Sequence, residues 1–140
     1  MTTICYRDGV LAADSLVTLG STKVHGNYQK IRRIGEYLVG TAGSVADCQA
    51  FVVWLKECDS TQPPPKGEYG ALVVGPQGRV REIENGSVLP CPRGAKFFAL
   101  GSGGPYALAA MYAGATATEA VKIAAKIDTS TGLPVKTLKI

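Results

Sequence analysis

Short apolar stretches separated by turn residues fill the first part of the chain. Residues 2–6 are β-branched and aromatic, residues 10–13 are apolar, and a glycine-containing turn lies between them, which predicts a β-hairpin. A three-residue loop would place Asp14 opposite Thr2, and a two-residue loop would place it opposite Thr3. The pattern leaves both registers open.

Further strands are expected before the first helix. Residues 16–19 and 23–24 extend the second strand of the predicted hairpin. Residues 28–34 and 37–40 form another strand pair around the Gly35-Glu36 turn.

A helix is predicted over residues 44–58, because its apolar residues recur at spacings of three and four, and Ser44 is the expected N-cap. Residues 60–67 contain three consecutive prolines and are expected to form an exposed connection. This connection is not a domain boundary, since residues 71–74 form a short apolar strand that needs a sheet to join.

The second half of the chain continues the alternation of strands and helices. Its expected elements are strands at 71–74, 79–83 and 97–100, an antiparallel pair of alanine-rich helices at 105–113 and 116–127, and a strand within 132–140. The order predicts a single α+β domain over residues 1–140, in which antiparallel sheets carry helices on the outside.

Composition narrows the class of protein. A chain of 140 residues with 46% hydrophobic and 19% charged residues is long enough to bury a core. No apolar run reaches the roughly 20 residues of a membrane helix, and no hydrophobic leader follows a basic start, so a cytoplasmic protein without a membrane partner is expected. The net charge of +4 and the sparse basic clusters do not indicate a nucleic-acid partner.

The sequence lacks the residue patterns that most common catalytic mechanisms require. The single histidine, His25, is not near a nucleophile elbow, and the carboxylates show no metal-binding spacing. The four cysteines lie far apart without a C-x-x-C pair, which indicates reduced thiols and no zinc site. We therefore expect no cofactor and no metal.

The chain terminus offers another chemistry. Met1 precedes a small residue, and its removal would leave Thr2 with a free α-amine beside its hydroxyl. An α-amino group has a reference pKa of about 7.7 to 8.0 and can accept the hydroxyl proton near neutral pH. Considered alone, Thr2 is more simply a threonine that begins an edge strand.

Six blocks of sequence together resemble the family of HslV and proteasome β subunits, which are N-terminal nucleophile (Ntn) hydrolases. They are TTI at 2–4, LAADS at 11–15, KVHGNYQKIRRI at 23–34, GTAGSVAD at 40–47, LGSGGPYA at 100–107 and, more weakly, DTSTG at 128–132. The resemblance implies a four-layer α-β-β-α sandwich of antiparallel sheets. It also implies that one helix of the family fold, after residues 44–58, is missing here.

The resemblance assigns roles to five residues. It makes Thr2 the nucleophile, with its own amine as proton acceptor, and Asp14 and Lys30 its charged neighbours. A lysine cation beside the amine and hydroxyl favours their deprotonated forms. Gly43 matches the position whose backbone N–H faces the developing oxyanion, and Ser102 matches the serine that hydrogen-bonds the terminal amine.

Two further residues match a proteasome pattern in which an acid and a hydroxyl contact the catalytic amine. These are Asp128 and Thr131, with threonine in place of the usual serine. The same stretch also fits an ordinary turn at the C-terminal end of a helix. Both interpretations stay open.

The function implied by the resemblance is a threonine-type endopeptidase that acts on peptides or unfolded proteins. Its expected partners are further copies of the chain in a ring and an ATP-dependent unfoldase. Two alternatives remain: an inactive structural subunit, which the missing helix favours, and an Ntn amidohydrolase that acts on small amides.

Overall fold

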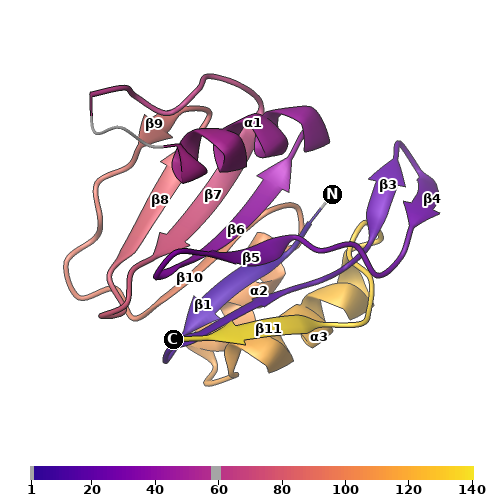
Figure 1. Ribbon diagram of the computed structural model, residues 1–140. Helices are drawn as coiled ribbons and strands as arrows, with labels where there is room; N and C mark the ends of the chain where they lie inside the picture. The colour runs from indigo at the N-terminus through magenta and orange to yellow at the C-terminus, as the bar shows by residue number, and fades with distance from the viewer. Residues whose placement is uncertain (1, 58–60) are drawn as a thin grey trace.

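The computed structural model describes residues 2–57 and 61–140, and two of its sheets stack face to face (Figure 1). The first sheet is antiparallel and has the strand order β10-β1-β2-β11. Its strands are β1 (Ile4–Arg7), β2 (Val10–Ala13), β10 (Phe97–Leu100) and β11 (Lys136–Lys139).

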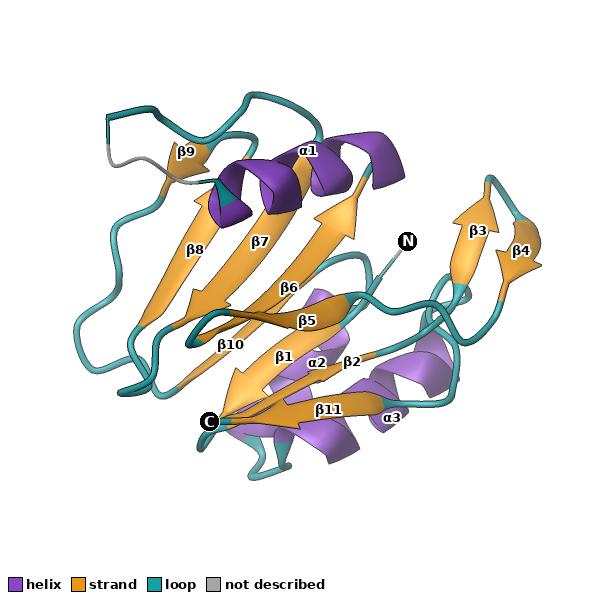
Figure 2. Ribbon diagram, viewed as in Figure 1, coloured by secondary structure: helices purple, strands orange, loops and turns teal. Residues whose placement is uncertain are grey.

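The second sheet is also antiparallel and has the strand order β5-β6-β7-β8-β9. Helix α1 (Val45–Lys56) covers its outer face, and α2 (Gly104–Tyr112) and α3 (Ala117–Ile127) cover the outer face of the first sheet (Figure 2). The strands of the second sheet are β5 (Ile31–Ile34), β6 (Tyr37–Gly43), β7 (Tyr69–Val74), β8 (Val80–Glu84) and β9 (Ser87–Val88).

Alternation along the strands builds the layers. In β1, Ile4 and Tyr6 belong to the core between the two sheets, whereas Cys5 packs against α2 and α3. In β7, Leu72 faces the same central core and Val73 packs beneath α1. The predicted four-layer α-β-β-α sandwich of antiparallel sheets is therefore confirmed.

The loop of the first hairpin has two residues, the shorter of the two predicted lengths. Asp8 and Gly9 both adopt positive φ values, 51° and 80°, and form a two-residue turn that matches the twist of the strands. The three-residue register, with Thr2 opposite Asp14, is wrong. Asp14 lies opposite Thr3 instead, and its backbone N–H donates to the Thr3 carbonyl at 3.1 Å.

Residues 16–25 do not extend the second strand as predicted. They form a separate hairpin of β3 (Val17–Leu19) and β4 (Thr22–His25), which projects from the body of the molecule (Figure 1). Beyond β2, the backbone N–H of Ser15 donates to the Gly132 carbonyl, and the chain reverses at Gly20, which has a φ of 60°. His25 is exposed on this hairpin.

The structure confirms the predicted helix, α1, and its N-cap Ser44, whose hydroxyl accepts a hydrogen bond from the backbone N–H of Asp47. The predicted last residue of this helix, Cys58, lies outside the described residues. Residues 61–67 form no helix, and Pro65 and Lys66 pack against Gly86 in the β8–β9 turn. The hydroxyl of Tyr69, in β7, donates to the Pro65 carbonyl at 2.6 Å. The family fold thus has one helix fewer here.

The two C-terminal helices pack against each other and against the first sheet, as expected. A capping box starts α3, in which Thr116 and Glu119 bond each other's backbone N–H groups. Cys5, Cys48 and Cys91 are free thiols, and burial raises the pKa of Cys5 to about 12. In the described parts of the chain, no helix is long and apolar enough to cross a membrane.

Candidate active site

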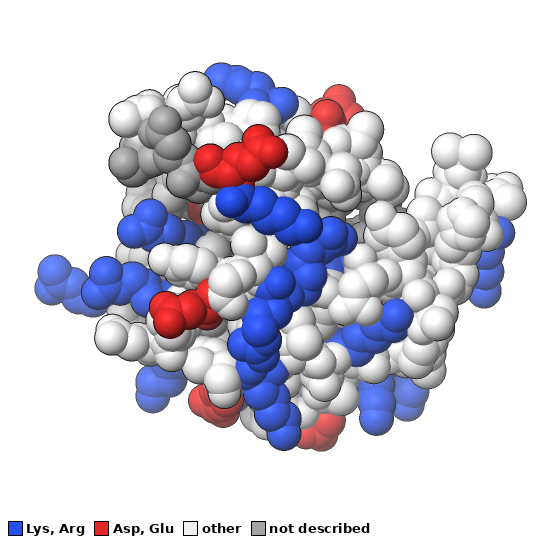
Figure 3. Space-filling view, in the orientation of Figure 1, with Lys and Arg blue, Asp and Glu red and all other residues white. Residues whose placement is uncertain are grey.

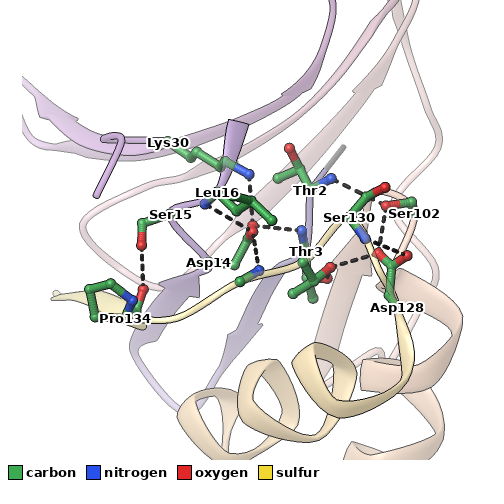
Figure 4. Close-up of polar contacts among 12 residues, drawn as sticks. Thr2, Thr3, Asp14, Ser15, Leu16, Lys30, Ser102, Asp128, Ser130 and Pro134 are labelled. Atoms are coloured by element: carbon green, nitrogen blue, oxygen red, sulfur yellow. Dashed lines mark hydrogen bonds and ion pairs between the residues drawn. The ribbon is translucent and has the colours of Figure 1, made fainter. Parts of the chain in front are cut away.

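Thr2 lies just before β1, lines a pocket together with the end of β6, and is only 5% exposed. Figure 4 shows it between two polar groups, Asp14 and Lys30 on one side and Ser102 and Asp128 on the other. The position of Thr2 is fixed by the strand that follows it, because β1 is hydrogen-bonded to β10 on one side and to β2 on the other. The resemblance had assigned Thr2, Asp14, Lys30 and Ser102 to one site and had left the role of Asp128 open. The structure brings these five residues together.

Asp14 and Lys30 form a buried ion pair. The Lys30 ammonium donates to Oδ1 of Asp14 at 2.9 Å, and the two side chains are 5% and 0% exposed. The backbone N–H of Thr3 donates to the same oxygen at 3.0 Å. The other carboxylate oxygen accepts from the backbone N–H groups of Gly132, at 3.0 Å, and Leu16, at 3.3 Å.

These contacts determine the charge beside Thr2. Burial lowers the pKa of Lys30, and the adjacent Asp14 carboxylate opposes this effect by favouring the ammonium form. Four donors around one carboxylate fix its orientation, so the position of the Lys30 ammonium is fixed as well. The pair thus places a desolvated cation against the first residues of β1.

Ser102 reaches Thr2 because glycines surround it. The Thr2 backbone nitrogen donates to the Ser102 hydroxyl at 3.3 Å. Gly101 has a φ of 94°, and a Cβ there would lie 1.9 Å from the Thr2 carbonyl oxygen. A Cβ at Gly103 would lie 1.9 Å from the Thr3 hydroxyl. Only glycine permits so close an approach of this turn to the start of β1.

Asp128 organises the hydroxyl groups behind Ser102. Its Oδ2 accepts from the hydroxyls of Ser102, at 2.7 Å, and Thr131, at 2.6 Å. The Thr131 hydroxyl lies 2.7 Å from that of Thr3. Because a hydroxyl has one hydrogen, Ser102 can only accept from Thr2, and Thr3 must donate to Thr131. Asp128 therefore contacts the Thr2 nitrogen through Ser102.

The same contacts stabilise the Asp128 carboxylate. Partial burial raises its pKa, but hydrogen bonds from Thr131, Ser102 and the backbone of Ser130 outweigh that effect and lower the pKa below its ordinary value. Asp128 is also the C-cap of α3, where the helix dipole disfavours an anion. A turn at the end of α3 and a contact with the Ser102 hydroxyl are thus both present at Asp128.

Gly43 ends β6 beside Thr2 and must be glycine. Its φ is 123°, and a Cβ there would lie 2.5 Å from the Glu68 carbonyl oxygen. Gly43 and Thr2 line the same pocket of about 80 Å³, together with Lys30 and Cys48.

Some residues of the site were not singled out from the sequence. Thr3 is completely buried and links both polar groups, through its N–H to Asp14 and its hydroxyl to Thr131. Gly132 donates its N–H to Asp14. Both residues lie within blocks that carry the resemblance, TTI at 2–4 and DTSTG at 128–132, which was the available signal. Within the described residues, His, Cys, Asp and Glu side chains form no group suited to a metal ion.

Comparison with known sequences identifies related proteins. A model of the proteasome subunit family matches residues 2–59. The ATP-dependent protease subunit HslV of Petrotoga mobilis is 34% identical over 125 residues, covering 74% of this chain and 70% of that protein.

Comparison with solved structures agrees. Thiobacillus denitrificans BPH in complex with epoxomicin has a TM-score of 0.70 and 28% identity, covering 99% of this chain and 97% of that one. Eukaryotic HslV from Trypanosoma brucei has a TM-score of 0.75 and 24% identity, covering 99% and 100% of the two chains, and shows the same fold.

Replacing Asp14 by alanine is expected to destabilise the fold by about 3–5 kcal/mol, because it leaves a buried ammonium without its partner. Urea denaturation measures this loss. The exposed Glu36→Ala is the control and should change the free energy of unfolding by less than about 0.5 kcal/mol. Equal stability of the two variants would contradict the buried pair.

The stabilisation from Asp128 should depend on pH. The pKa of Asp128 is lower in the folded chain than in the unfolded chain. Ionised Asp128 therefore stabilises the fold at any pH above its unfolded-state pKa, and this contribution is lost as the pH falls through its folded-state pKa. The difference in melting temperature between the parent and Asp128→Asn should therefore shrink as the pH is lowered from 7 to 2. The exposed Asp8→Asn controls for the loss of one carboxylate, and a difference that is constant across this range would contradict the assignment.

Proposed function

The chain belongs to the HslV and proteasome family of Ntn hydrolases, whose members are threonine-type proteases, and on that premise we propose that it is an endopeptidase with Thr2 as its N-terminal nucleophile. The observation that carries this proposal is the hydrogen bond between the Thr2 nitrogen and Ser102, which is in turn fixed by Asp128. It orients the nitrogen, which belongs to the same residue as the hydroxyl.

The direction of that hydrogen bond suits a base. Removal of Met1, which lies outside the described residues, converts the Thr2 nitrogen into an α-amine. Since the Ser102 hydrogen is donated to Asp128, the amine donates to Ser102 and keeps its lone pair available. That lone pair accepts the proton of the Thr2 hydroxyl, directly or through one water molecule.

The reaction then proceeds by acyl transfer. The Thr2 oxygen attacks the peptide carbonyl carbon, and the resulting oxyanion faces the backbone N–H of Gly43. The C–N bond breaks, the amine returns its proton to the departing nitrogen, and an ester to Thr2 remains. Water activated by the same amine hydrolyses the ester and restores the hydroxyl.

Lys30 has an electrostatic role in this scheme. Its ammonium lines the pocket of Thr2 and favours the neutral amine and the developing alkoxide. Asp14 keeps the ammonium charged and in place. The Asp128 carboxylate has the opposite effect, because an anion favours the protonated amine. Ser102 lies between Asp128 and the Thr2 nitrogen and is hydrogen-bonded to both.

The related proteins also support the proposal. BPH of Thiobacillus denitrificans forms a complex with epoxomicin, and the relative in Petrotoga mobilis is a subunit of an ATP-dependent protease. We therefore propose that this chain acts as a ring of identical subunits with an ATP-dependent unfoldase. Exposed apolar side chains on α1, Val45 and Val53, are suited to subunit contacts.

Thr2→Ala is expected to reduce peptide and casein cleavage by at least about a thousandfold, because it removes the attacking oxygen. Thr2→Ser should retain measurable activity, and the exposed Thr22→Ala serves as the matched control. Circular dichroism must show unchanged folding. Retained activity of folded Thr2→Ala would refute the nucleophile, and cleavage of small amides without casein would indicate an amidohydrolase.

A further inference from the structure

Two pockets open on either side of Gly43. The first is the pocket of Thr2 and Lys30, which also includes Arg32. The second has a volume of about 640 Å³ and is lined by residues of both sheets, including Leu100, and by Ser102. Gly43 lines both, so a peptide chain that passes Thr2 has one pocket on each side of the bond that is cut.

The proton transfers determine which side is which. The departing nitrogen takes its proton from the Thr2 amine, and that amine is held by Ser102. The leaving half of the substrate therefore lies toward Ser102 and the second pocket. The half that becomes esterified to Thr2 lies toward Lys30 and the first pocket, which is called the acyl pocket below.

The acyl pocket carries positive charge. Among its described lining residues are two cations, Lys30 and Arg32, and no Asp or Glu. The Lys30 charge is balanced by Asp14, which is fully buried behind it. Arg32 is bound instead to a neutral group, the Gln29 carbonyl, at 3.4 Å. Its guanidinium thus supplies the uncompensated charge of this pocket.

Strand β5 turns Arg32 toward the pocket. Ile31 faces the central core, so Arg32, the next residue, faces the α1 side of the sheet. There its charge lowers the pKa of the Cys48 thiol on α1, although burial and then the Asp47 carboxylate raise that pKa by more. Figure 3 shows Lys and Arg side chains gathered in a band over β5 and β11, with acidic side chains toward its edges.

The second pocket has the opposite charge. Glu82 and Glu84 point to the same face of β8 and line it together with Glu68. Burial and the neighbouring Glu84 raise the pKa of Glu82, as expected where carboxylates crowd. An acidic substrate side chain would be repelled there. The charges of the two pockets thus favour one orientation of an acidic residue.

From this asymmetry we propose that Arg32 makes the enzyme selective for peptide bonds that follow an acidic residue. The side chain of that residue occupies the acyl pocket, where its carboxylate pairs with the Arg32 guanidinium. This inference rests on the proposed function, since it assumes that Thr2 is acylated by the substrate.

Three internally quenched peptides with identical flanks test the inference, and they contain Glu-Lys, Gln-Lys or Lys-Glu at the centre. The full-length protein should cleave after Glu about 10- to 100-fold more efficiently, in kcat/KM, than after the isosteric Gln, as a charge-assisted contact predicts. The Lys-Glu peptide should not be cut between its two charged residues. Mass spectrometry of the products locates each cut.

Two arginine variants identify the residue responsible. Arg32→Gln should abolish the preference for Glu over Gln while cleavage after Gln persists. Arg33→Gln should leave the preference intact, because that neighbouring arginine is exposed and donates to the Lys139 carbonyl of β11.

Each outcome separates the inference from the proposed function. Equal cleavage after Glu and Gln by the parent protein would overturn the selectivity while leaving the peptidase in place. A preference that survives Arg32→Gln would overturn the role of Arg32. If neither these peptides nor casein were cleaved, the proposed function itself would fail, and the inference with it.

Discussion

The arrangement of this molecule depends on the buried carboxylate of Asp14. It accepts hydrogen bonds from the Lys30 ammonium and from the backbone of Thr3, Leu16 and Gly132. Thr3, Lys30 and Gly132, from three other parts of the chain, are thereby held against the segment 14–16 around one charge. Desolvating an ion pair costs free energy, so such a pair does not by itself argue for stability. Its value here is to keep a cation fixed beside Thr2.

A second network restrains the other side of Thr2, and it follows different principles. Asp128 is partly accessible, and it orders a chain of hydroxyls through Ser102, Thr131 and Thr3. Glycines make this network possible, since a side chain at Gly103 would collide with the Thr3 hydroxyl. The two networks meet at Thr3, which has no exposed surface. The residue after the proposed nucleophile therefore connects both halves of the site.

Local patterns predicted the layers well because alternation and helical spacing directly report which face is buried. The hairpin register was harder, since a turn containing Asp8 and Gly9 is compatible with two loop lengths until their φ values are known. The missing helix and the Thr2 site came from family resemblance, not from periodicity. The charge of the acyl pocket required the structure, because Arg32 and its neighbour Arg33 look alike in sequence but contact different elements.

In the proposed reaction, Thr2 becomes an N-terminal nucleophile whose own amine acts as the base. Epoxomicin tests it most directly, because an epoxyketone captures an amine and a hydroxyl on the same residue. The purified protein would be incubated with this compound and its intact mass recorded. We expect a chain that lacks Met1 and carries one inhibitor, and no adduct on Thr2→Ala. A processed protein without an adduct, or an adduct that persists on Thr2→Ala, would contradict it.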